Sequence, residues 1–256
     1  MTSDRLPLFV EVALQENQRL ISRGLGNDLP LKEVLTLCQN FRLAGIGALF
    51  LSATSDAFLW RLHQSGRCFF HFLSRADDGE KLTSKCLPFF DAIAAGDLDT
   101  AREIALHAKR FREPDMEYPE DFLFVEFLMQ RYFLGATDDT CNELLTHYEA
   151  ALQGAEDFRL GICRALLIGD EAAFGSELSG FLSARNDSIQ DLSANGSIEQ
   201  ETLATEGQLS VEGLALIRLA ELQGFSTEED YLNIPSIARE PSARPFQRDS
   251  WRSTPL

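Results

Sequence analysis

The chain has 256 residues, of which 45 % are hydrophobic and 10 % aromatic, so it can bury a substantial core without an external anchor. Its formal net charge of −17 disfavours nucleic acids and anionic membranes as partners. The N-terminus carries charges where a signal peptide needs an apolar core, and no apolar run reaches the roughly 18 residues of a membrane span, so we expect a cytoplasmic protein.

The negative charge is concentrated in one part of the chain. Residues 1–112 carry 14 basic and 13 acidic side chains, whereas residues 113–230 carry 25 acidic and five basic ones. Residues 231–256 carry four arginines and two acids. A field of this size attracts basic proteins and speeds their association at low salt. The alternative is that the acids only keep the surface soluble.

Turn signals divide the chain into segments of helix length, and none shows the alternation that is typical of a strand. The segments with helical periodicity are residues 6–23, 30–51, 55–75, 89–107 as two joined helices, 119–134, 137–153, 158–168, 170–182 and 209–224. The polar interval 187–206 has weak periodicity, and we expect a long loop or a partly exposed helix end there.

Two corners share one pattern. Gly96-Asp97 and Gly169-Asp170 each follow one apolar helical segment and precede another. Glycine adopts the left-handed conformation that ends a helix, and the following aspartate caps the next helix by accepting its free amide hydrogens. Each pair of segments is therefore a helical hairpin, which must pack on neighbouring helices to bury its apolar face.

The C-terminal part contains two further signals. The sequence Ser226-Thr-Glu-Glu229 has the spacing of a capping box after Gly224, which predicts a helix start. Residues 239–256, with three prolines and four arginines, predict an extended or flexible tail that wraps back on the acidic body.

These patterns predict an all-α fold: an array of about ten helices packed as antiparallel helical hairpins, repeat-like, with an extended C-terminal tail. We expect a single domain over residues 1–238. It has a possible N-terminal sub-bundle over residues 1–110 and an acidic one over residues 119–238.

A search for catalytic and metal-binding motifs finds none: there is no Gly-x-Ser-x-Gly, His-Glu-x-x-His, Walker loop or Cys-x-x-Cys. Asp97, Asp99 and Glu103 cluster at the first corner, but Asp97 is needed as a cap, so a catalytic carboxylate pair is the weaker hypothesis. His63 and His71 fall on nearly the same helix face, yet further ligands for a metal are not evident. We therefore predict no enzymatic activity, cofactor or metal.

The five cysteines are odd in number and form no close pairs, and most occupy apolar helical positions. They are expected to be reduced and buried, as in a cytosolic protein. They are Cys38, Cys68, Cys86, Cys141 and Cys163.

The C-terminal helix carries a resemblance to a known family. The segment 209–224, with Gly213, Leu214, Ala215, Leu219 and Ala220, is followed by Tyr231-Leu-Asn-Ile-Pro235. With the order of the preceding elements, it resembles the immunity protein family forty-nine of bacterial polymorphic toxin systems, over residues 31–239. The resemblance implies an all-α, non-enzymatic antitoxin that binds and neutralises a toxin delivered between bacteria, through type VI secretion.

The charge agrees with that resemblance, because toxins that cleave nucleic acid are usually basic around their substrate cleft. We hypothesise occlusion of a basic, nuclease-like toxin, with the acidic and aromatic connection at residues 110–121 as the contact. The alternatives are a solvated loop with no partner, and a helical scaffold or chaperone that binds a protein without inhibiting it. An exposed apolar helix face leaves a homodimer open. The hypothetical contact residues are Glu113, Asp115, Glu117, Tyr118, Glu120 and Asp121.

Overall fold

The computed structural model describes residues 4–24 and 29–253, which form helices and no β-strand. Within these ranges the α-helices are α1 (Leu6–Gly24), α2 (Leu31–Ser52), α3 (Ser55–Leu73), α4 (Leu87–Ala95), α5 (Leu98–His107), α6 (Pro119–Tyr132), α7 (Asp138–Leu152), α8 (Phe158–Ile168), α9 (Glu171–Ala194), α10 (Gln200–Ala204) and α11 (Val211–Leu222). Short 3-10 helices are η1 (Asp78–Glu80), η2 (Thr83–Lys85), η3 (Ser236–Arg239) and η4 (Ser250–Arg252). The predicted all-α class is confirmed.

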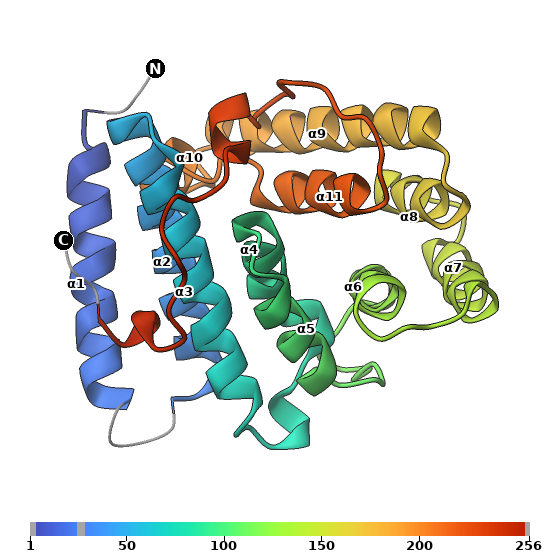
Figure 1. Cartoon of the computed structure of the whole chain (residues 1–256), viewed down its shortest axis with the longest axis horizontal. Coiled ribbons are helices and arrows are strands. Elements are labelled where there is room, and N and C mark those ends of the chain that lie inside the picture. Colours follow the sequence, from blue (N-terminus) through green and yellow to red (C-terminus); the bar gives the residue numbers. More distant parts are fainter. Residues whose placement is uncertain (1–3, 25–28, 254–256) are drawn as a thin grey trace.

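Helices that follow one another in the sequence pack on one another. The N-terminal helices α1, α2 and α3 lie side by side, and α4 packs on α3 (Figure 1). Beyond α5 the chain continues through α6, α7, α8 and α9, each in contact with its neighbour. Helix α11 returns to pack on α4, which joins the C-terminal part of the chain to the centre. This succession agrees with the predicted repeat-like packing of hairpins.

Helix α2 is long and apolar, and it packs against both α1 and α3. Its most apolar 18-residue window has a mean hydropathy of 1.5, enough by length and composition to cross a membrane, and 61 % of that window is buried inside the fold. Two glycines allow close packing: a Cβ atom at Gly45 would lie 3.0 Å from the carbonyl oxygen of Phe58, and one at Gly47 only 2.3 Å from Val10. These are the contacts of a core helix.

A buried ion pair joins α2 to α4. The Arg42 Nε atom donates to Asp91 Oδ1 at 2.7 Å, and Ser65 on α3 donates to Asp91 Oδ2 at 2.5 Å. Arg42 also donates to the carbonyl of Leu87 and to Glu206. Burial opposes charge on both partners, but the two carboxylates raise the pKa of Arg42, so its guanidinium stays charged. The pair fixes three helices at one point.

Both predicted hairpin corners are confirmed. Gly96 and Gly169 have φ angles of 79° and 75°, the left-handed region that glycine adopts without a Cβ clash. The Asp97 side chain accepts a hydrogen bond from Thr100 N, and the Asp170 side chain accepts one from Ala173 N. The α4–α5 and α8–α9 pairs are therefore built by the same corner.

The structure decides two local predictions. The interval 187–206 is mostly helical, because α9 continues to Ala194 before the short α10, so the expectation of a partly exposed helix end is the correct one. The predicted capping box is wrong: no helix starts at residues 226–229. Instead, the Ser226 amide donates to Glu171, because α11 returns the chain to the start of α9.

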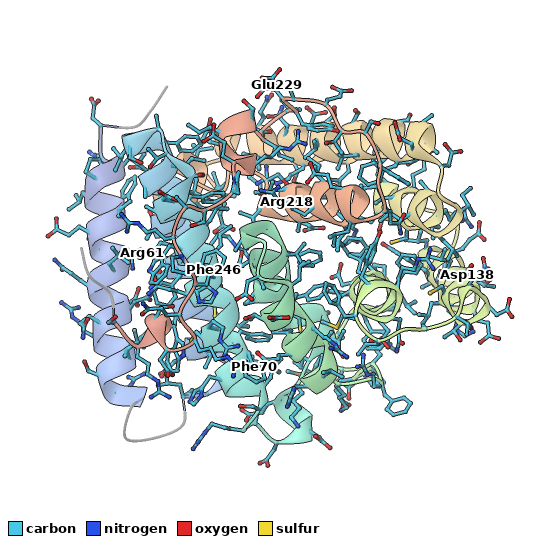
Figure 2. All side chains as sticks on the ribbon, viewed as in Figure 1. Arg61, Phe70, Asp138, Arg218, Glu229 and Phe246 are labelled. Atoms are coloured by element: carbon cyan, nitrogen blue, oxygen red, sulfur yellow. The ribbon has the colours of Figure 1, made fainter. Side chains whose placement is uncertain are left out.

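Residues 240–253, here called the strap, lie on α3 and not on the acidic half (Figure 1). Asp56, in the first turn of α3, accepts a hydrogen bond from Ala243 N at 2.7 Å. Phe246 lies over α3 (Figure 2), stacked on His63 at 4.5 Å between ring centroids. Trp251 is only 9 % exposed. Of the predicted tail, Arg239 does bind the acidic half, through Glu221 at 2.6 Å. The rest lies on α3 instead, because α3 offers polar and aromatic partners along one face.

We expect Arg42→Met to lower the free energy of unfolding by about 3–5 kcal/mol, because it leaves the Asp91 carboxylate buried without its cation. The double variant Arg42→Met/Asp91→Leu should recover most of that loss, because the fully buried carboxylate is removed and Glu206, which also loses Arg42, is only partly buried. Denaturant unfolding at neutral pH measures both. A loss below about 1 kcal/mol for the single variant would contradict this role of the pair.

Candidate protein-binding surface

The connection between α5 and α6, residues 108–118 and here called the α5–α6 loop, is held to the preceding chain at its first residues. The Lys109 amide donates to the carbonyl of Lys81 at 3.1 Å, and the Thr83 hydroxyl donates to the carbonyl of Lys109. Arg110 donates to the carbonyl of Ala105 at 2.6 Å. The start of the loop therefore has a fixed position against η2 and α5.

The carboxylate of Glu117 holds the other end of the loop. Glu117 is 4 % exposed. One of its oxygens accepts from the Ser84 amide at 2.7 Å and the other from the Glu113 amide at 2.9 Å. The Arg112 guanidinium donates to the Glu117 carbonyl at 2.9 Å. A buried carboxylate that bridges two amides in this way organises backbone on both sides of it.

Three large apolar side chains point from this braced loop into solvent. Phe111 is 77 % exposed, Met116 is 58 % exposed and Tyr118 is 70 % exposed. Together with Ile168, they are the four most exposed large hydrophobic residues of the described chain. Clusters of exposed apolar side chains with polar rims mark interaction surfaces.

The predicted contact residues divide into two groups. Asp115 and Tyr118 are exposed, and Glu113, Glu120 and Asp121 are half-buried at the loop and the first turn of α6. Glu113 pairs with Lys109 at 2.7 Å, and Asp121 pairs with Arg159 at 2.9 Å.

Glu117 is the exception. Its carboxylate is buried and bound to backbone amides, so it supports the loop and does not face a partner. The sequence prediction did not include Phe111 and Met116, because an apolar residue in a polar stretch looks the same whether it is buried or exposed. Their position beside prolines and acids, away from any helical period, was the available signal.

A second cluster forms around the first hairpin corner. His63 Nδ1 lies 2.5 Å from Asp97 Oδ2, which also accepts from the Thr100 hydroxyl, and His63 Nε2 lies 2.9 Å from the carbonyl oxygen of Gln247. Burial acts against the charge of Asp97, but the hydrogen bonds from His63 and Thr100 outweigh it and lower its pKa. A carbonyl only accepts, so Nε2 carries a hydrogen and is occupied by the strap. The pair thus has no free base.

The three acids proposed for that corner do border one cavity, of about 420 Å³. Asp97 binds His63, Glu103 pairs with Arg67, and Asp99 is exposed. Two of the three carboxylates are thus engaged by basic side chains, Asp97 by His63 and Glu103 by Arg67. No three His, Cys, Asp or Glu side chains of the described residues are arranged to hold a metal ion.

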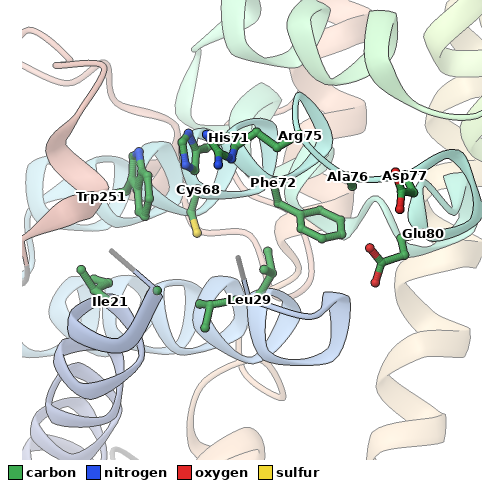
Figure 3. A pocket seen from close by; sticks show the side chains of 12 residues that line it. Ile21, Leu29, Cys68, His71, Phe72, Arg75, Ala76, Asp77, Glu80 and Trp251 are labelled. Carbon is green, nitrogen blue, oxygen red and sulfur yellow. The ribbon is translucent and has the colours of Figure 1, made fainter. Parts of the chain in front are cut away.

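Another cavity, of about 350 Å³, lies between α1, α3 and the strap (Figure 3). Ile21, Leu29 and Phe72 line it together with Trp251, while Asp77 and Glu80 stand at the opposite end from the tryptophan. A catalytic pocket brings titratable groups together at one point. In this cavity the titratable side chains are instead spread along its length, with His71 and Arg75 near Trp251 and Phe72 and the two acids at the far end.

All five cysteines are free and buried, as predicted. Burial raises the pKa of Cys38, Cys86 and Cys163, so these thiols stay protonated and unreactive at neutral pH.

The comparison with protein families identifies the chain. The sequence model of immunity protein 49 matches residues 49–237. The chain belongs to the immunity protein 49 family. No curated protein and no solved structure matches it. The matched segment includes the α5–α6 loop and both hairpin corners, whereas α1 and the strap lie outside it.

Membership of this family supports an immunity role, in which the chain binds a cognate toxin. The surface features agree with binding more than with chemistry. The titratable cluster at the corner is satisfied internally, whereas the α5–α6 loop exposes side chains without internal partners.

The two hairpin caps provide a matched pair of variants. Asp170→Ala should lower the free energy of unfolding by about 1 kcal/mol, the usual value of an N-cap. Asp97→Ala should cost about 2–3 kcal/mol, because His63 and the Thr100 hydroxyl also lose their partner. Denaturant unfolding measures both. Equal losses would contradict the additional role of Asp97.

The pH dependence of the same variant follows from the lowered pKa of Asp97. A carboxylate with a lower pKa in the folded state stabilises the fold above its unfolded pKa, near 3.9, and loses that contribution as the pH falls further. The difference between Asp97→Ala and the parent protein should therefore shrink below about pH 4. A stability difference that grows on acidification would contradict a lowered pKa of Asp97 in the folded state.

Proposed function

We propose that this immunity protein neutralises a basic toxin, of the nuclease class, by covering its substrate cleft. The observation that carries the proposal is the combination of the family with the charge of residues 113–230, which hold 25 acids and five arginines. A nuclease cleft must attract phosphates, so an acidic protein competes for the same surface.

The five arginines of the acidic half compensate only a small part of the charge of its 25 acids. Arg131, Arg159, Arg164 and Arg218 form salt bridges with acids of the same half, and Arg185 donates to backbone carbonyls. Each salt bridge neutralises only one or two carboxylates. A large excess of acids, including those on the outer face of α7, remains to steer a cationic protein.

We place the contact at the α5–α6 loop and the first turn of α6, where acidic and aromatic side chains occur together. We further propose that the protein acts in the cytoplasm of a bacterium that exchanges toxins by type VI secretion. Binding without catalysis suffices for this role, because a covered cleft is inactive while the complex lasts.

The variant Asp115→Lys/Glu120→Lys tests the contact, because neither side chain holds the loop together. A matched control is Asp139→Lys/Glu143→Lys on the exposed face of α7, which changes the net charge equally. Association with the toxin encoded beside this gene should slow by roughly tenfold for the loop variant and by much less for the control. The loop variant should also show a weaker salt dependence.

Stopped-flow association at two salt concentrations provides the measurement, together with growth rescue in cells that express the toxin. Equal slowing by both variants would mean that only net charge matters. Binding of the parent protein without growth rescue would favour a scaffold or chaperone over an immunity protein.

A further inference from the structure

The α5–α6 loop concentrates apolar surface that the fold does not use. Phe111, Met116 and Tyr118 occur within eight residues and rank among the four most exposed large hydrophobics of the described chain. The fourth, Ile168, stands at the end of α8. An isolated exposed hydrophobic residue is ordinary, whereas three on one short loop are not.

Hydrogen bonds hold the loop backbone around Met116 and Tyr118. Glu117 lies between Met116 and Tyr118, and its buried carboxylate bonds the amides of Ser84 and Glu113. The Met116 amide donates to the carbonyl of Glu113 at 3.0 Å. A partner that binds these side chains therefore does not have to order the backbone, which is a large part of the entropic cost of loop-mediated recognition.

The two arginines of the loop are hydrogen-bonded to oxygen atoms of the protein itself. Arg110 donates to the carbonyl of Ala105 and to Glu126, and Arg112 donates to the carbonyls of Pro114 and Glu117. Both guanidinium groups are thus bound to the protein's own oxygen atoms. Asp115, adjacent to Met116, is exposed without such a partner.

We infer that Phe111, Met116 and Tyr118 form an apolar anchor patch for the toxin, and that the toxin surface it fits is an apolar recess bordered by lysine or arginine. This inference rests on the proposed function. The charge explains how the toxin is attracted, and the apolar patch adds what holds it once it is bound. Acidic side chains at the edge of an interface mainly set the association rate, whereas desolvated aromatic anchors at its centre set the dissociation rate. Glu117 acts as a positioning residue for the patch.

Alanine variants of the patch test the inference against matched controls. Tyr118→Ala and Phe111→Ala should each raise the Kd for the toxin encoded beside this gene by about 30-fold or more, mainly through faster dissociation. Met116→Ala should raise it less. Ile168→Ala and Leu222→Ala, at exposed apolar positions on α8 and α11, should change the Kd less than about threefold. Because all five side chains are exposed, the variants should fold normally.

The positioning role of Glu117 needs a separate readout. Glu117→Gln keeps one carbonyl oxygen but cannot accept from both amides, so hydrogen exchange of the loop amides in the free protein should speed up. The Kd should rise, while thermal unfolding checks that the fold is kept. Faster exchange with an unchanged Kd would show that Glu117 orders the loop but does not position the patch for binding.

The outcomes separate this inference from the proposed function. If the parent protein binds the toxin and rescues growth, but the patch and control variants bind equally well, the anchor patch is wrong and the immunity role stands. If the parent protein does not bind the toxin, the proposed function fails first. If Tyr118→Ala converts a dimer to a monomer in sedimentation and leaves the toxin Kd unchanged, the patch is a self-contact and the inference is overturned.

Discussion

The buried pair of Arg42 and Asp91 is the contact on which the arrangement of the central helices depends. It joins α2 to α4, includes Ser65 of α3, and extends through Arg42 to Glu206 after α10. An apolar interface tolerates small shifts of one helix along another, whereas a charged group without water is stable only in the geometry that satisfies it. Helix α4 is thereby fixed, and the corner at Gly96 and Asp97 sets the direction of α5. The α5–α6 loop begins where α5 ends, and its own hydrogen bonds to η2 and α5 then hold it in place.

Much of this fold is accessible from the sequence, because helical periodicity and corner residues act locally. The Gly-Asp corners are read correctly since glycine and the capping aspartate both act within a few residues of the turn. The position of the strap cannot be predicted from local patterns, because its partners Asp56 and His63 lie far from it in the sequence. The capping-box prediction fails for the same reason: Ser226 has the right spacing, but a long-range bond to Glu171 takes its amide. Local patterns cannot show which distant group competes for a hydrogen bond.

In the candidate site, too, the sequence shows the local composition but not the long-range contacts. The acidic and aromatic composition of the loop is visible in the sequence, but the roles of its neighbouring residues are not. Glu117 and Asp115 are two residues apart and chemically similar. Glu117 is buried and accepts hydrogen bonds from two backbone amides, whereas Asp115 is exposed. Only the position of the Ser84 and Glu113 amides distinguishes them. His63 and Asp97 give the converse case, because a pair that resembles catalytic machinery in isolation proves to be occupied once Gln247 of the strap is placed.

A protein that neutralises another by binding must attract it and then hold it, and the proposed contact assigns these two tasks to different residues. Steering requires only an excess of charge, so the acids are spread over many helices and tolerate changes in position. Tight, selective binding requires side chains that lose water in one defined geometry, which a mobile loop provides at a high entropic cost. In the contact proposed here, the second requirement falls to a short loop whose backbone is hydrogen-bonded to η2, to α5 and to its own buried glutamate. On this proposal, moving single acids on the charged surface would leave the attraction intact, whereas a change of partner would require different apolar side chains on the same loop.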